Sequence, residues 1–178
     1  MYNKILEKDL NLEISKKLDK ELTKKGAITY MTRTQDVDLS SIYDSRKKRG
    51  DLYRRLLYIK KKNSDLYLSI HINWYKNANH SGVEVLYNSI NKDNKILANS
   101  IMKAFEKELN SKTVVKTTDL YMYRNTTVPG VLIECGYLSN YSERQNLQNS
   151  KYQTKLAKII TKGVINYLKN KDKIKYIL

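Results

Sequence analysis

Hydrophobic residues recur at the spacing of helix turns in four segments of the chain. Near the N-terminus a leucine or isoleucine returns every fourth residue from Leu6 to Leu22, and Gly26 follows as a stop signal. The later segments show the same period with one apolar face each. This pattern predicts helices over residues 6–22, 51–62, 93–109 and 156–168.

Short runs between these helices have the pattern of β-strands. Strands are predicted over residues 27–32, 66–72, 82–87, 120–123 and 131–133. The charged segment 33–50 predicts a loop. Strands that alternate with helices indicate an α/β protein, with a mixed, largely parallel sheet flanked by helices on both faces in a three-layer sandwich. In such sheets functional sites gather at the carboxyl ends of the strands.

The composition is that of one folded domain. The chain has 178 residues, 40% of them hydrophobic, with six Gly and one Pro, which excludes a collagen-like or disordered chain. One cysteine, Cys135, excludes an internal disulfide, and two histidines exclude a three-histidine metal site. No apolar run is long enough to span a membrane, and early charges interrupt any signal-peptide pattern. We expect a single domain over residues 1–178, with no export signal in this chain.

The chain is strongly basic, with 34 Lys and Arg against 18 Asp and Glu and a formal net charge of +16. The excess lies in residues 44–62 and 151–176, and the remainder is nearly neutral. Solvated helix faces explain this more simply than a nucleic-acid surface, because arginine is scarce and no recognition-helix pattern is present. Attraction to an acidic polymer stays open.

Two polar residues at predicted strand ends carry the functional argument. His71 lies on the polar face of its strand, and Glu134 directly follows the apolar run 131–133. Each alone has a structural explanation, a hydrogen-bonded histidine or a capping carboxylate, but the pair favours a site. Glu7 is a weaker candidate, since acids are favoured in the first turn of any helix. His80 lies in a polar loop, where we expect it to be solvated.

Several blocks, taken together and in this order, resemble one enzyme family. They are Glu7-Lys8-Asp9-x-Asn11-Leu12, Met31-Thr32-Arg33, Leu52-x-x-Arg55, Ser69-Ile70-His71-Ile72-Asn73, Ser81-Gly82-Val83-Glu84-Val85 and Leu132-Ile133-Glu134-Cys135-Gly136-Tyr137-Leu138-Ser139-Asn140. The chain resembles zinc-dependent N-acetylmuramoyl-L-alanine amidases, most closely the CwlD-type sporulation and germination branch. The resemblance covers nearly the whole chain.

The resemblance implies a zinc enzyme that cleaves the amide between N-acetylmuramic acid and L-alanine in peptidoglycan of the cell wall or spore cortex. Carried over by motif, Glu7 and His71 are zinc ligands and Glu134 is the catalytic glutamate. A zinc-bound water has a pKa near neutrality, and a glutamate general base fits that chemistry. The resemblance also implies action outside the cytoplasm and a possible accessory protein as partner.

One block of the family is not found. The family's first ligand histidine lies in a Gly-His-Gly-Gly block at the end of the first strand, and residues 1–6 hold no such block. We therefore expect a domain truncated at the N-terminus relative to the family, without the first strand, that binds zinc weakly because two ligands seldom fix a tetrahedral site. Three explanations stay open: a misplaced start codon, a truncated and decayed gene, or a split protein whose missing N-terminal segment is supplied by another chain.

Two other functions stay open at this level. The first is a non-catalytic peptidoglycan-binding or regulatory relative that keeps the fold without the metal. The second is a basic nucleic-acid-binding protein, for which affinity would fall steeply with salt. The nucleic-acid-binding function is ranked last, because it leaves His71 and Glu134 without a role. We therefore expect no nucleic-acid partner.

Overall fold

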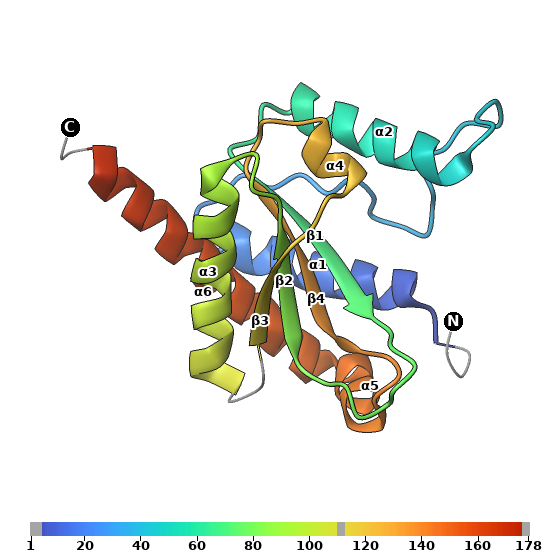
Figure 1. Cartoon of the computed structure of the whole chain (residues 1–178), viewed down its shortest axis with the longest axis vertical. Helices are drawn as coiled ribbons and strands as arrows, with labels where there is room; N and C mark the ends of the chain where they lie inside the picture. Colours follow the sequence, from blue (N-terminus) through green and yellow to red (C-terminus); the bar gives the residue numbers. More distant parts are fainter. Residues whose placement is uncertain (1–4, 110–112, 176–178) are drawn as a thin grey trace.

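A computed structural model of the chain describes residues 5–109 and 113–175, with side chains as far as Lys171. The elements follow one another as α1 (Glu7–Thr23), α2 (Lys47–Lys61), β1 (Tyr67–Asn73), β2 (Val83–Tyr87), α3 (Lys92–Leu109), β3 (Thr113–Thr117), α4 (Tyr121–Arg124), β4 (Gly130–Tyr137), α5 (Tyr141–Gln148) and α6 (Ser150–Lys175) (Figure 1). None of the described helices combines the length and apolar character needed to cross a membrane.

The strands form one mixed sheet in the order β1-β4-β2-β3. β1 pairs with β4 and β2 with β3 in parallel, whereas β2 and β4 are antiparallel. Two of the three pairings are therefore parallel, which confirms the expected largely parallel sheet. Figure 1 shows helices on both sides of it, as a three-layer α/β architecture requires.

One face of the sheet builds the main core. The inward residues of β1, β2 and β4 alternate along each strand and pack against α1, α3 and α6. Helices α3 and α6 approach closely at Gly163, where an added Cβ would lie 2.6 Å from the Cα of Ile101. This contact fixes how the two helices cross.

The other face is only partly covered. Tyr67, at the start of β1, packs with Ile59 of α2 and Tyr123 of α4 in a small second cluster. The rings of Tyr67 and Tyr123 lie 6.2 Å apart between centroids. The cover sits over the amino end of β1, whereas the side chain of His71, near the carboxyl end of this strand, is 40% exposed.

The four predicted helices are confirmed, with different ends. α2 begins at Lys47, four residues before its predicted start and inside the expected loop 33–50, and α6 extends well beyond 156–168 on both sides. The strands predicted at 66–72, 82–87 and 131–133 are β1, β2 and β4. Two elements were not predicted: the edge strand β3 and the short helix α5.

Two strand predictions were wrong. Residues 27–32 join no strand: Ile28 is 83% exposed and Tyr30 half-exposed, so their alternation reflects an exposed connection rather than a sheet face. Residues 120–123 fall on α4, a single helical turn that begins after Leu120. Four residues are too few for periodicity to separate a strand from a helical turn. In the structure the segment forms a helical turn that packs Tyr123 against Tyr67 of the sheet.

Candidate active site

Polar side chains form a row across three strands on the partly covered face of the sheet. His71 of β1 lies beside Glu134 of β4 in the parallel ladder, and Glu84 of β2 lies opposite Glu134 in the antiparallel ladder. Residues that pair directly project to the same side of a sheet. The sheet thus brings a histidine and two carboxylates together from segments far apart in the sequence.

Glu7 reaches this row from the first turn of α1. Its Oε1 atom lies 3.0 Å from Nδ1 of His71 and accepts hydrogen bonds from Nδ2 of Asn11 at 3.0 Å and from the backbone N–H of Ile72 at 3.3 Å. Burial by itself raises the pKa of Glu7, but the bonds to His71 and Asn11 outweigh it and lower this pKa to about 2. Glu7 is therefore a carboxylate at every physiological pH.

The imidazole of His71 is held from two sides. Its Nδ1 atom faces Glu7, and its Nε2 atom lies 3.1 Å from the hydroxyl oxygen of Ser69, two residues earlier on the same face of β1. A partner on one ring nitrogen fixes the orientation of the other. Ser69 therefore holds Nδ1 toward Glu7.

Glu134 has the environment of a proton acceptor. Its Oε2 atom is buried and has no hydrogen-bond partner among the described residues. Burial raises the pKa of Glu134 to about 7; His71 opposes this rise, while the negative charges of Glu7 and Glu84 add to it. A carboxyl group that titrates near neutrality can both take and return a proton.

Glu84 lies on the same face of the sheet as His71 and Glu134. It belongs to one of the family-like blocks of the sequence, but no role was predicted for it. Its carboxylate is nearly buried, accepts a hydrogen bond from the Tyr137 hydroxyl at 2.7 Å and pairs with Nζ of Lys116 at 2.5 Å. The amide of Asn73 donates to its other oxygen at 3.3 Å. The alternation of residues 82–87 could have identified it, since it places Glu84 on the sheet face opposite to that of Val83 and Val85.

Glu7 and His71 together fit a zinc site in part. Carboxylate oxygen and imidazole nitrogen are both zinc donors, and here they converge on one point. Within residues 5–109 and 113–175, no three His, Cys, Asp or Glu side chains group as a full ligand set. The other histidine, His80, is exposed, as expected, and its ring lies tilted against that of Tyr75 with 4.3 Å between ring centroids. Two donors are in place, and a third is not among the described side chains.

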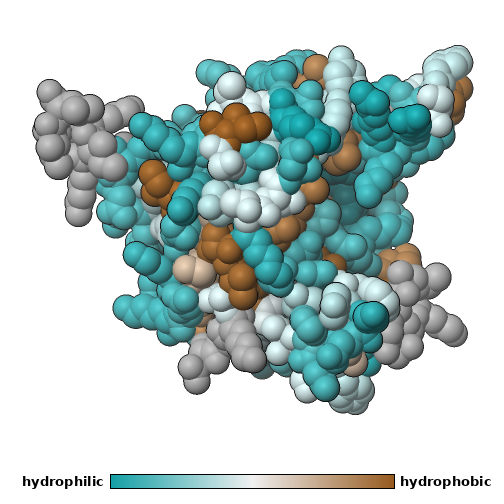
Figure 2. Space-filling view, viewed as in Figure 1, coloured by the Kyte–Doolittle hydropathy of each residue, from teal (hydrophilic) through white to brown (hydrophobic). Residues whose placement is uncertain are grey.

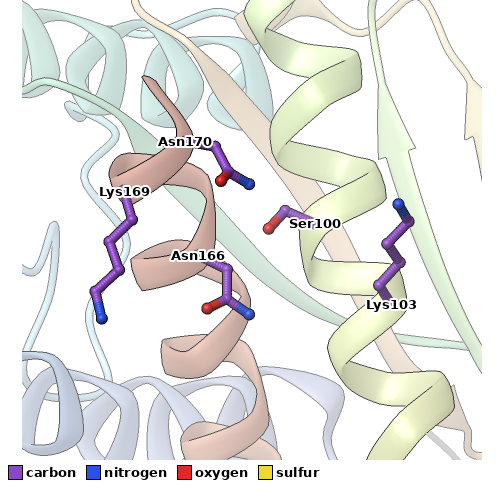
Figure 3. A pocket seen from close by; sticks show the side chains of 5 residues that line it. All are labelled: Ser100, Lys103, Asn166, Lys169 and Asn170. Atoms are coloured by element: carbon purple, nitrogen blue, oxygen red, sulfur yellow. The ribbon is translucent and has the colours of Figure 1, made fainter. Parts of the chain in front are cut away.

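A polar hollow between α3 and α6 offers no comparable chemistry. It has a volume of about 350 Å³, and Figure 3 shows that its lining comes from these two helices: Ser100, Lys103, Asn166, Lys169 and Asn170. The Ser100 hydroxyl is engaged, because it donates to the carbonyl of Gly163 at 2.8 Å. No histidine or carboxylate lines this hollow to activate a nucleophile.

Comparison with known proteins assigns the family. Residues 1–166 match the model of the N-acetylmuramoyl-L-alanine amidase family. The germination-specific N-acetylmuramoyl-L-alanine amidase of Bacillus subtilis (strain 168) is 36% identical over 173 residues, which are 94% of this chain and 73% of that protein.

Solved structures agree with this match. The CwlD amidase of Clostridioides difficile, solved in complex with the GerS lipoprotein, superposes with a TM-score of 0.87 at 30% identity, over 93% of this chain and 88% of that one. An N-acetylmuramoyl-L-alanine amidase of Clostridium difficile 630 gives a TM-score of 0.79 at 33% identity, over 94% and 86%. The chain therefore belongs to the N-acetylmuramoyl-L-alanine amidase family.

Proposed function

We propose that this chain hydrolyses the amide bond between N-acetylmuramic acid and L-alanine in peptidoglycan, with Glu134 as the catalytic residue and Glu7 and His71 as metal ligands. The observation that carries the proposal is the convergence of Glu7 on His71 beside Glu134, whose buried Oε2 atom has no hydrogen-bond partner in the described part of the chain. Membership of the family supports the substrate and the bond.

Glu134 has the central chemical task. As a carboxylate it accepts a proton from the attacking water, and as a carboxylic acid it returns that proton to the leaving amine of alanine. Its pKa of about 7 suits both directions, because neither form is strongly disfavoured near neutral pH. The neighbouring His71 side chain is 40% exposed, so a substrate can approach this row of residues from solvent.

Glu7 and His71 hold the metal in this proposal. The family is generally zinc-dependent, and bound zinc supplies a Lewis acid that polarises the carbonyl and lowers the pKa of water. Glu7 stays ionised because its pKa is about 2, so it is ready to ligate without releasing a proton. Ser69 keeps the His71 ring in place for the same purpose.

The setting of the activity follows from the relatives. We propose that residues 1–178 act as one catalytic domain outside the cytoplasm, on cell wall or spore cortex, as expected for a germination-specific amidase. We further propose an accessory protein as partner, because the CwlD amidase was solved with a lipoprotein bound. A non-catalytic wall-binding protein and a nucleic-acid-binding protein are not favoured by the family match.

Release of stem peptides from purified peptidoglycan tests the proposal. We expect the wild-type chain to release L-alanine-terminated peptides in the presence of zinc and to stop when a chelator is added. Glu134→Gln removes the proton acceptor with little change in shape, and we expect a loss of about 10²–10⁴-fold in rate. Glu106→Gln, an exposed glutamate on α3, is the matched control and keeps full activity. Release that survives in Glu134→Gln would refute the mechanism, and no release by wild type with zinc would refute the function.

A further inference from the structure

The basic segment 44–62 divides into paired and unpaired arginines. Asp44 is matched by Arg54, with 2.6 Å between Oδ2 and Nη1, and Asp51 is matched by Arg55. These are the two acidic residues of the segment, so both are already satisfied. Arg46 and Arg49 make no hydrogen bond or ion pair with any side chain in the described part of the chain. Their charges are thus available to a ligand.

Both free guanidinium groups line one hollow at the start of α2. The hollow has a volume of about 690 Å³ and lies between α2 and α4, where Tyr53 and Tyr121 add aromatic faces to Arg46 and Arg49. The guanidinium carbon of Arg49 lies 5.9 Å from the centre of the Tyr121 ring. A guanidinium stacked on a ring keeps its N–H edges free to bind an oxyanion.

One carboxylate, that of Asp44, also borders the hollow, but its charge is used inside the fold. Its oxygens accept from Arg54 and from the backbone N–H of Ser41. It lies directly over Gly50, because a Cβ at that position would overlap the carboxylate. Asp44 therefore acts as a brace for the loop before α2 and leaves the hollow positively charged.

The position of the hollow suits a substrate that is a polymer. α2 and α4 cover the same sheet face that carries His71 and Glu134, and Figure 1 shows the first turns of α2 and α1 on the same side of the molecule. Hydrophilic side chains dominate the surface around α2 (Figure 2). A long chain held at Glu134 can therefore reach the hollow with another of its groups.

We propose that Arg46 and Arg49, with Tyr53 and Tyr121, form a binding site for an anionic group of the cell-wall polymer, separate from the catalytic row. The chemistry recognised is an oxyanion carried next to a sugar ring or peptide plane that packs on tyrosine. A carboxylate of a peptide stem and a phosphate of a wall-attached polymer both have this chemistry. The identity of the polymer rests on the proposed function, whereas the anion site does not.

Co-sedimentation with insoluble peptidoglycan tests the site. All variants are made in the Glu134→Gln background, and release of stem peptides is measured in parallel. Any remaining hydrolysis is then seen directly, and a failure of the catalytic proposal is distinguished from a failure of the anion site. Arg46→Gln/Arg49→Gln removes two charges from the hollow. Lys60→Gln/Lys61→Gln removes two charges from the exposed far end of the same helix and is the matched control. Circular dichroism verifies that each variant is folded.

We expect the arginine variant to bind peptidoglycan about tenfold more weakly and the lysine variant within about twofold of its parent. Tyr121→Leu should weaken binding as well, because the ring that supports Arg49 is lost. Binding is also measured on peptidoglycan stripped of phosphate polymers. If the arginine variant binds more weakly than its parent on both materials, the bound group is a carboxylate. If it binds more weakly only on the unstripped material, the bound group is a phosphate. Equal losses in the two double variants would overturn the site, since they would show diffuse attraction. Tighter binding to a DNA duplex with the same arginine dependence would overturn the wall polymer as ligand.

Discussion

Oε1 of Glu7 lies 3.0 Å from Nδ1 of His71, although the two residues are 64 positions apart. The contact joins the first turn of α1 to the edge strand β1, so the sheet and the helix layer must be correctly packed for it to form. The pair has two consequences in the structure. It keeps Glu7 ionised, and it aims a carboxylate and an imidazole at the same point.

Zinc should stabilise the folded chain through Glu7 and His71. A ligand at 100 times its dissociation constant adds about 2.7 kcal/mol to the free energy of unfolding. We expect zinc to raise the melting temperature of wild type and to leave that of Glu7→Gln nearly unchanged, as measured by differential scanning calorimetry with and without chelator. Glu13→Gln, on the exposed side of α1, is the control and should respond like wild type. An equal response in Glu7→Gln would show that zinc binds elsewhere.

Ser69 should act as a positioning residue for His71. Ser69→Ala removes the hydroxyl near Nε2 and frees the ring to turn, so we expect zinc affinity to fall about tenfold. Ser69→Thr keeps the hydroxyl on a residue that suits a strand and should restore affinity. Isothermal titration calorimetry measures both variants. An unchanged affinity in Ser69→Ala would mean that packing alone orients the ring.

Glu134→Gln should separate activity from stability. Among residues 5–109 and 113–171 the buried Oε2 atom has no hydrogen-bond partner to lose, and a neutral amide is cheaper to bury than a carboxylate. The free energy of unfolding should therefore stay within about 1 kcal/mol of wild type or rise. The rate of peptide release should fall while peptidoglycan binding is kept. Urea unfolding measures the stability, and co-sedimentation measures the binding to peptidoglycan. A large loss of stability would assign Glu134 a structural role instead.

Asp51 should make stability depend on pH. It pairs with Arg55 through two contacts of 2.6 and 2.9 Å and accepts the backbone N–H of Leu39 at 2.8 Å. Burial raises the pKa of Asp51, but these bonds outweigh it and hold the pKa below its usual value. A lowered folded-state pKa means that the stabilisation is present above the unfolded pKa, about 4, and is lost as the pH falls through the folded value.

Asp51→Asn should therefore cost about 1–2 kcal/mol at pH 7 and progressively less below pH 4. Urea unfolding across this pH range measures the difference from wild type. Asp119→Asn, whose ion pair with Arg124 is exposed, is the control and should change stability little at any pH. A penalty for Asp51→Asn that stays constant from pH 7 to pH 3 would contradict the ionised pair.

Gly163 should be required for the packing of α3 on α6. Gly163→Ala places a methyl group 2.6 Å from a backbone atom, the Cα of Ile101, which cannot rotate away. Overpacking costs about 1–3 kcal/mol and exceeds the gain of about 1 kcal/mol in helix propensity. We expect a net fall in melting temperature, with Lys158→Ala on the exposed side of α6 as a neutral control. A more stable Gly163→Ala chain would show that the helices can move apart freely.

The sequence alone was sufficient for the main elements and for the catalytic candidates. Helical periodicity and strand alternation depend on contacts within a few residues, so α1, α2, α3 and α6 and the strands β1, β2 and β4 could be predicted. The alternation in β1 also placed His71 on the polar face. The motif around Glu134 pointed to the same site by resemblance to a family.

Only the tertiary structure decided which residues meet. Sheet order places Glu84 opposite Glu134, and local pattern contains no information on strand neighbours. Likewise nothing along residues 44–62 distinguishes Arg54, which is paired with Asp44, from Arg49, which has no ion-pair partner among the described side chains and lines a hollow. Pairing of charges, like pairing of strands, depends on residues distant in the chain, and these come into contact only when the core forms.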